Sequence, residues 1–159
     1  MSGYFGAQMP VPVPQLDDTA FWRSCNERVL RFQACADCAR LRHPPIPMCP
    51  HCRSVRVPWR PAPEQARVFS FTVIHHGVHP ALAGRLPYVV VVLEFDGMEG
   101  VRLVSNLTDV DPREIRIGQM VALYWDEIAE RRYLPRFRPT SCALQAGSTV
   151  PAHVPKPTR

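Results

Sequence analysis

Four cysteines arranged as two CxxC pairs constrain this chain more than any other feature of its sequence. The pairs are Cys35-Ala-Asp-Cys38 and Cys49-Pro-His-Cys52, separated by ten residues. Each pair can place two thiolates on one tight turn, and two such turns can surround one Zn²⁺ tetrahedrally at Zn–S distances of about 2.3 Å. Four sulfur ligands leave no coordination position for water or substrate. We therefore expect a structural zinc ion held by Cys35, Cys38, Cys49 and Cys52.

Two other uses of these cysteines, a redox dithiol or disulfide bonds, fit the sequence less well. A redox CxxC motif normally stands alone near a βαβ pattern, whereas here two pairs lie close together with Pro44-Pro45 between them. Free thiolates that bind a metal suit a reducing compartment. Met1 to Gln15 lacks the basic and apolar regions of a secretory signal, and no apolar run approaches the ~20 residues needed to cross a bilayer. We expect a cytoplasmic protein that does not enter a membrane.

The first part of the chain is predicted to form an extended lead, then a helix and the zinc ribbon. Residues 1–16 make up the N-terminal lead, because the prolines at positions 10, 12 and 14 remove backbone donors and exclude a helix. Residues 17–60 hold the helix and ribbon. The helix is predicted from Thr19 to Leu30, with Asp17 or Asp18 as its N-cap. Its apolar stripe is formed by Phe21, Cys25 and Val29, with Trp22 beside them.

From residue 61 to residue 142 the apolar pattern changes to a period of two, which indicates β-strands. In the first strand, Phe69, Phe71 and Val73 alternate with Val68, Ser70 and Thr72. Five short strands with turns between them are typical of a five-stranded OB barrel; they are predicted at Arg67–His75, Tyr88–Phe95, Val101–Leu107, Met120–Asp126 and Arg131–Arg138. Residues 143–159 are rich in Ser, Thr, Ala and Pro, and we predict a disordered, flexible tail. The fold class is mainly β.

The order of these features resembles the acyl-CoA-associated proteins of domain-of-unknown-function family thirty-five, over about Asp17 to Pro139. The matching segments are Phe21-Trp22, Leu30-Arg31-Phe32-Gln33-Ala34-Cys35, Pro44-Pro45, Trp59, Phe71-Thr72-Val73, Pro87-Tyr88, Gly100-Val101-Arg102-Leu103, Ile117-Gly118 and Leu134-Pro135-Arg136-Phe137-Arg138-Pro139. Two departures are a proline-rich stretch after the ribbon, where relatives often have a glycine-rich turn, and a long loop at residues 78–85. The resemblance implies a rubredoxin-like zinc ribbon followed by an OB fold.

The resemblance also implies a function as a subunit. Such proteins are usually non-catalytic partners of acyl-CoA enzymes: thiolases, thiolase-like aldolases of steroid side-chain breakdown, and MaoC-like hydratases. A chain without a fused hydratase domain looks most like the partner of a thiolase-like aldolase that cleaves a steroid side-chain β-hydroxyacyl-CoA. In that interpretation the two subunits form a heterotetramer, the partner supplies every acid and base, and this chain meets the CoA thioester only through the partner's site.

Three aromatic residues are the predicted contacts with that partner. Phe21, Trp22 and Trp59 lie next to or between the predicted domains, and aromatic side chains are enriched at protein interfaces. The proline-rich lead could join them, because a polyproline segment loses little entropy on docking. The alternative for Trp59 is that it packs between ribbon and barrel.

The sequence offers no complete set of catalytic residues. His75 and His76 are neighbours at the end of a predicted strand and would point to opposite faces. His79 lies in the loop that follows. Cys25 lies on the apolar stripe of the helix, and Cys142 has no identifiable base nearby. We therefore expect no catalysis by this chain alone.

The competing hypothesis is a module that binds single-stranded nucleic acid, since OB folds and zinc ribbons both do so. Such a module needs exposed aromatic residues among basic ones, and the net charge is +5. The candidate residues are Arg131, Arg132, Tyr133, Arg136, Phe137 and Arg138. Acidic residues at positions 126, 127 and 130 directly precede this stretch and would oppose a phosphate backbone, so nucleic acid ranks second.

Overall fold

The described chain has one short α-helix near its N-terminus, and a left-handed backbone conformation ends it. The computed structural model describes residues 3–82 and 84–140. A 3-10 turn, Leu16–Asp18, leads directly into α1, Thr19–Asn26. Arg28 has a φ of +58°, and the N–H groups of Arg28 and Val29 donate to the carbonyls of Cys25 and Ser24, both at 2.9 Å. This is the left-handed C-cap of a Schellman motif. The helix therefore ends four residues before the predicted Leu30.

The zinc ribbon is a small antiparallel sheet. Its strands are β1 (Arg31–Ala34), β2 (Leu41–Arg42) and β3 (Trp59–Pro61), in the order β2-β1-β3. Gln33 is the residue that joins all three, since it is registered with Arg42 on one side and with Trp59 on the other. The second cysteine-bearing turn, with Cys49 and His51, borders one cavity together with Glu99 and Gly100 from the barrel part of the chain.

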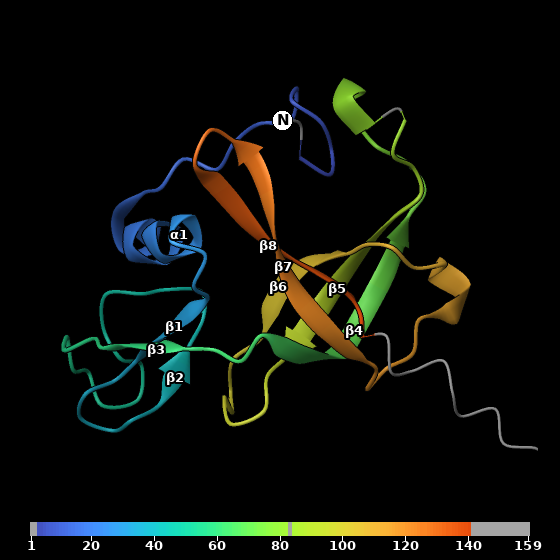
Figure 1. The fold of residues 1–159 in the computed structure, drawn as a ribbon. Helices are drawn as coiled ribbons and strands as arrows, with labels where there is room; N and C mark the ends of the chain where they lie inside the picture. The colour runs from blue at the N-terminus through green and yellow to red at the C-terminus, as the bar shows by residue number, and fades with distance from the viewer. Residues whose placement is uncertain (1–2, 83, 141–159) are drawn as a thin grey trace, which may run out of the picture.

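The remaining five strands form the predicted closed barrel (Figure 1). They are β4 (Gln65–Ile74), β5 (Tyr88–Glu94), β6 (Leu103–Leu107), β7 (Met120–Ala129) and β8 (Arg132–Pro139), in the order β4-β5-β6-β8-β7, closed by pairing of β7 with β4. Short 3-10 turns lie at Pro80–Leu82 and Pro112–Glu114. The fold class of one short helix, ribbon and five-stranded barrel is confirmed.

The parallel pairing of β6 with β8 is the thinnest seam of the barrel. A single pair, Leu107 with Phe137, is in register there, whereas every other barrel pairing is antiparallel and longer. Pro135 and Pro139 in β8 have no N–H to donate. The strands are held instead by the Ser105 hydroxyl, which donates to the Pro135 carbonyl at 2.6 Å, and by the Thr108 N–H, which donates to the Phe137 carbonyl at 2.9 Å.

The alternation predicted for the first barrel strand fails at its start. A β-bulge separates Val68 from Ser70, so the strand changes phase within the predicted pattern. Val68 is buried and Phe69 lies on the outside of the barrel. The guanidinium of Arg102 lies 3.4 Å from the Phe69 ring centroid, which gives this exposed aromatic ring a cation–π partner.

Ribbon, helix and barrel share one hydrophobic core. Phe21 and Cys25 of α1 and Phe32 of β1 belong to the same buried cluster as the barrel interior. The ring of Phe95, at the end of β5, connects them, because its centroid lies 5.2 Å from Phe32 and 6.2 Å from Phe137. Among the described residues no helix is long and apolar enough to cross a bilayer. Cys142 and the predicted tail at residues 143–159 lie outside the described residues.

Candidate zinc centre and docking surface

The structure brings the sulfur atoms of all four predicted ligands together. The Sγ atoms of Cys35, Cys38, Cys49 and Cys52 all lie within 4.8 Å of one another. The Cys35–Cys52 distance is 3.4 Å and the Cys38–Cys49 distance is 3.6 Å. A tetrahedron with Zn–S bonds of about 2.3 Å has edges of about 3.8 Å. The four thiolates therefore fit one Zn²⁺.

The two CxxC turns are built in the same way. In each, the N–H four residues after the first cysteine donates to that cysteine's carbonyl: Ala39 to Cys35 at 3.0 Å and Arg53 to Cys49 at 2.8 Å. Ala39 and Arg53 both have positive φ angles, +58° and +62°. The left-handed conformation turns the chain back after each pair, a role more often filled by glycine. Sequence analysis gave no signal for these two residues.

Backbone donors favour the thiolate form that a metal requires. The Cys38 backbone N–H lowers the pKa of Cys35 to about 6, and the Cys52 backbone N–H lowers the pKa of Cys49. Cys35 and Cys49 are buried, and Cys52 is exposed. A backbone hydrogen bond involving Ser54 lowers the pKa of Cys52, but without the metal its hydrogen bonds with the other three thiols raise that pKa to about 12. Since metal ligands must be deprotonated, the turns favour the required form at Cys35 and Cys49. The ribbon is thus a structural zinc site, and four sulfur ligands give the metal an organising role.

Of the three predicted contact residues, Phe21 and Trp22 line a surface groove, and Trp59 does not. Phe21 is 4% exposed and belongs to the core, so it can only support the groove from beneath. Trp22 is half-buried; its indole N–H donates to the Asp18 carboxylate at 3.2 Å. Trp59 is half-buried and packs against the shared core, as its alternative interpretation required. Their role in binding a partner stays a prediction.

The groove beside Trp22 lies where helix, ribbon and barrel meet. Its volume is about 310 Å³, and its walls include Pro44, Pro45, Leu134 and Pro135. Its lining combines one aromatic face with proline rings, which lose little freedom on contact. The same groove is also lined by Asp18, Ser105, Asn106 and Arg136, so a partner segment placed there would meet apolar and polar groups together.

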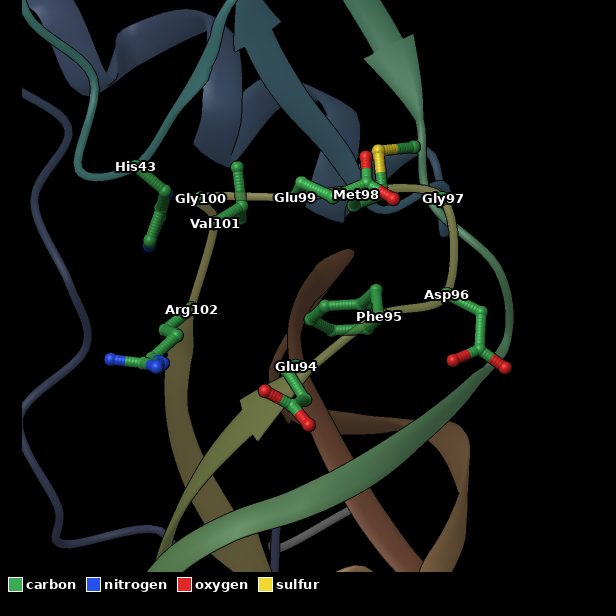
Figure 2. A pocket seen from close by; sticks show the side chains of 10 residues that line it. All are labelled: His43, Glu94, Phe95, Asp96, Gly97, Met98, Glu99, Gly100, Val101 and Arg102. Carbon is green, nitrogen blue, oxygen red and sulfur yellow. The ribbon is translucent and has the colours of Figure 1, made fainter.

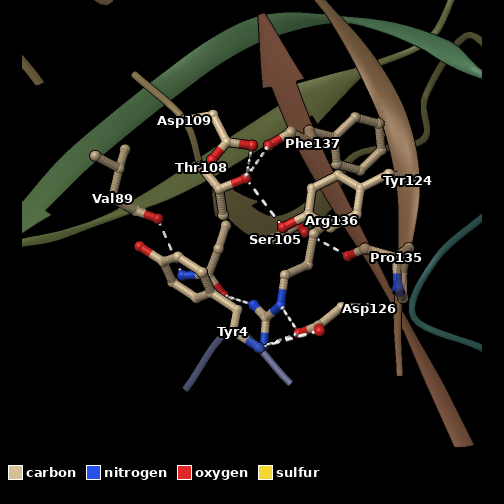
Figure 3. A network of polar contacts seen from close by, with 11 residues as sticks. Tyr4, Val89, Ser105, Thr108, Asp109, Tyr124, Asp126, Pro135, Arg136 and Phe137 are labelled. Atoms are coloured by element: carbon tan, nitrogen blue, oxygen red, sulfur yellow. Dashed lines mark hydrogen bonds and ion pairs between the residues drawn. The ribbon is translucent and has the colours of Figure 1, made fainter. Parts of the chain in front are cut away.

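A polar cluster at the end of the barrel was missed by sequence analysis (Figure 3). The Arg136 Nε donates to the Asp126 carboxylate at 2.6 Å, and Arg136 also donates to the Asn106 side chain. The Tyr4 N–H donates to both Asp126 oxygens at 3.0 Å. The Arg136 guanidinium lies 5.4 Å from the Tyr4 ring centroid and 5.0 Å from that of Phe5. The N-terminal lead is therefore fastened to the barrel.

Two of the six residues proposed for nucleic-acid binding are buried. Phe137 is fully buried and Arg136 is 5% exposed, so neither can meet a base or a phosphate. Tyr133 is half-buried, with the Arg28 guanidinium 5.2 Å from its ring centroid. Arg131, Arg132 and Arg138 remain exposed, but no exposed aromatic ring stands between them among the described residues.

The other candidate catalytic residues are not brought together. His75 and His76 are exposed after β4, and the His79 Nδ1 accepts the Ala81 N–H at 3.2 Å. Burial raises the pKa of Cys25 to about 12, so its thiol stays protonated at neutral pH. Within the part of the chain that the structure describes, no cysteine thiol is hydrogen-bonded to a histidine ring.

Comparisons with known proteins agree with this geometry. The family described as the ChsH2 rubredoxin-like zinc ribbon domain matches residues 22–56, and the ChsH2 C-terminal OB-fold domain matches residues 59–126. The solved structure described as "Ltp2-ChsH2(DUF35) aldolase" is 41% identical, with a TM-score of 0.73, and covers 80% of this chain and 98% of that one. The chain belongs to the DUF35 family.

Two curated relatives of this DUF35 chain are named as hydratase subunits. "Probable enoyl-CoA hydratase alpha subunit" of Thermomonospora curvata is 44% identical over 80% of this chain and 40% of its own length. "3-oxo-4,17-pregnadiene-20-carboxyl-CoA hydratase alpha subunit" of Mycobacterium tuberculosis is 37% identical over 72% of this chain and 36% of its own length. The DUF35 chain thus spans about two fifths of the length of these relatives.

Proposed function

We propose that this chain is a non-catalytic accessory subunit of a thiolase-like acyl-CoA enzyme, an aldolase that cleaves a steroid side-chain β-hydroxyacyl-CoA. In this proposal the ribbon and helix dock on the partner, and the subunit stabilises the partner and helps to shape its acyl-CoA site. All proton transfers occur on partner residues. The complex is a heterotetramer of two chains of each kind, in the cytoplasm.

The observation that carries the proposal is the match to the Ltp2-ChsH2(DUF35) aldolase. It extends over 80% of this chain and 98% of that one at 41% identity, so the similarity is not confined to one domain. The hydratase names of the longer relatives support a wider association with acyl-CoA enzymes. The chain's own chemistry agrees, because its zinc site is closed by four sulfur ligands and its buried thiol is protonated.

Reconstitution tests the proposal. The chain is mixed with the Ltp2 aldolase subunit, and complex formation is followed by size-exclusion chromatography with light scattering. Cleavage of a steroid β-hydroxyacyl-CoA is measured for each protein alone and for the mixture. We expect a heterotetramer, no cleavage by this chain alone, and cleavage that appears or rises in the mixture.

Two results would overturn the proposal. One is cleavage by this chain alone that is lost in His75→Ala or His76→Ala. The other is submicromolar affinity for single-stranded DNA at physiological salt that is lost in Tyr133→Ala without unfolding, which would favour the nucleic-acid hypothesis. A basic surface alone gives only weak binding that moderate salt removes.

A further inference from the structure

A buried arginine in the ribbon lacks partners for most of its guanidinium group. Arg42, at the end of β2, is 8% exposed. Its Nε donates to the Gln33 side-chain oxygen at 2.7 Å, an oxygen that also accepts the Ile46 N–H at 3.0 Å. Nη1 and Nη2 of Arg42 are buried and have no hydrogen-bond partner among the described residues. An arginine cannot lose its charge in a protein, so this charge is buried without a counter-charge.

The other buried arginine shows what the fold does when it supplies the partner itself. Arg136, 5% exposed, is held by the Asp126 carboxylate and the Asn106 side chain. No ion pair formed by the described residues includes Arg42. A buried charge without a partner is strongly unfavourable. The contrast indicates that the partner of Arg42 comes from outside the described fold.

Arg42 borders a cavity at the junction of the ribbon with the turn between β5 and β6. This cavity, of about 470 Å³, is also lined by Arg40, His51, Glu99 and Gly100. A neighbouring cavity of about 510 Å³ shares Glu99 and Gly100 and extends to His43 (Figure 2). The Nδ1 of His43 is also buried without a partner. We call this junction, between residues 40–51 and residues 94–102, the ribbon–turn seam.

The geometry and charge of the seam select the chemistry of the missing group. Nη1 and Nη2 form a planar fork that matches the two oxygens of a carboxylate. The exposed Arg40 lines the same cavity and adds positive charge, while Glu99 is the one acidic residue of that cavity. The neighbouring cavity adds Glu94 and Asp96 to the seam. A single negative charge is therefore better suited to the seam than a phosphate dianion, which the three carboxylates of the seam would repel more strongly.

We propose that the ribbon–turn seam is part of the docking surface and that Arg42 receives an aspartate or glutamate side chain of the partner enzyme. The inference rests on the proposed function, and it names the chemistry by which the partner is recognised. Arg42 belongs to the ribbon, which is also the element that docks on the partner in the proposed function. In the free chain Nη1 and Nη2 of Arg42 are closed off from solvent, so docking includes a shift of the Arg42 side chain or of the turn at residues 94–102 that uncovers them. The carboxylate then offsets the cost of the unpaired buried charge.

The first experiment measures the free chain. Arg42→Met keeps the apolar stem of the side chain and removes the charge, and the Gln33 oxygen still accepts the Ile46 N–H. We expect the melting temperature to stay unchanged or to rise, with zinc content unchanged. The control is Arg136→Met, which leaves Asp126 buried without its partner and should lower the melting temperature clearly.

The second experiment measures binding to the Ltp2 aldolase subunit by surface plasmon resonance. We expect Arg42→Met to weaken binding at least about thirtyfold, mainly through a faster off rate that persists at high salt, because a buried charge pair is lost. Arg42→Lys, which cannot form the planar fork, should give an intermediate value. The control Arg40→Gln removes an exposed charge at the rim, and it should alter only the on rate and its salt dependence.

Glu99→Gln decides whether the chain supplies the carboxylate itself. If Glu99 is the partner of Arg42, both Glu99→Gln and Arg42→Met will lower the melting temperature of the free chain, and the inference is wrong. If the wild-type chain binds Ltp2 and Arg42→Met binds equally well, the inference is wrong while the proposed function survives. If the wild-type chain does not bind Ltp2, both are overturned.

Discussion

Removing the charge of Asp126 should destabilise the barrel more than any exposed ion pair could. Asp126→Asn keeps the size of the side chain but leaves the Arg136 guanidinium, 5% exposed, without a counter-charge. Breaking a buried pair costs about 3–5 kcal/mol. The asparagine oxygen can still accept from Tyr4 and Arg136, so we expect a value near about 3 kcal/mol. For a chain of this length that corresponds to a melting temperature lower by about 10 °C.

The assay is thermal unfolding of the zinc-loaded chain, followed by circular dichroism and by urea titration. The matched control is Asp96→Asn, whose partner Arg67 lies at 3.3 Å in an exposed pair, and its effect should stay below about 1 kcal/mol. The double variant Asp126→Leu with Arg136→Met should recover most of the loss, because no charge is then left unpaired. If Asp126→Asn costs no more than Asp96→Asn, the buried pair does not stabilise the barrel as argued.

Three further outcomes can be measured. The purified chain should carry about one Zn²⁺. Cys38→Ser should lose the metal and the folded structure of the ribbon, because the ribbon's fold depends on the metal. Stoichiometric zinc in this variant, found by metal analysis, would contradict the assignment of ligands. Trp22→Ala should weaken binding to Ltp2 about thirtyfold with zinc retained, and loss of zinc in this variant would mean that Trp22 belongs to the core. Phe21→Ala should lower the free energy of unfolding, measured by urea titration, by about 3–5 kcal/mol. Burial raises the pKa of Cys25 to about 12, so its reactive thiolate forms only as the pH rises towards that value. Iodoacetamide should therefore leave Cys25 of the native chain unmodified at pH 8. Labelling of Cys25 at pH 8, detected by peptide mass mapping, would refute the burial of this thiol.

The parts of the fold that follow from local spacing could be predicted from the sequence. The CxxC pairs dictate two tight turns, and the alternating apolar residues of the barrel strands dictate their faces wherever the backbone stays regular. The predictions failed where a single backbone irregularity changed the pattern. Arg28 in a left-handed conformation ends α1 early, and the bulge after Val68 turns Phe69 outward. Neither the arginine at position 28 nor the residues at the bulge are of a type that predicts an irregular backbone.

Long-range polar contacts could not be predicted at all. Tyr4 and Asp126 are 122 residues apart, and no periodicity connects an extended lead with the seventh strand. The same holds for Arg42, whose burial depends on how the ribbon packs against the β5–β6 turn. In the candidate site, the metal ligands were visible because they are a local motif, whereas the seam exists only once the two domains share a core.

The short pairing of β6 with β8 determines where the barrel opens locally. Only one residue pair is in register across it. The Ser105 hydroxyl, the Thr108 N–H and the contact of the Arg136 guanidinium with the Asn106 side chain complete the closure. Separating these strands exposes few backbone hydrogen bonds, since the other edges of β6 and β8 remain paired with β5 and β7. The barrel can therefore open between β6 and β8 into a curled sheet, and this opening costs less free energy than global unfolding. Amide hydrogen exchange would detect this opening at Thr108, ahead of the amides in the centre of β5.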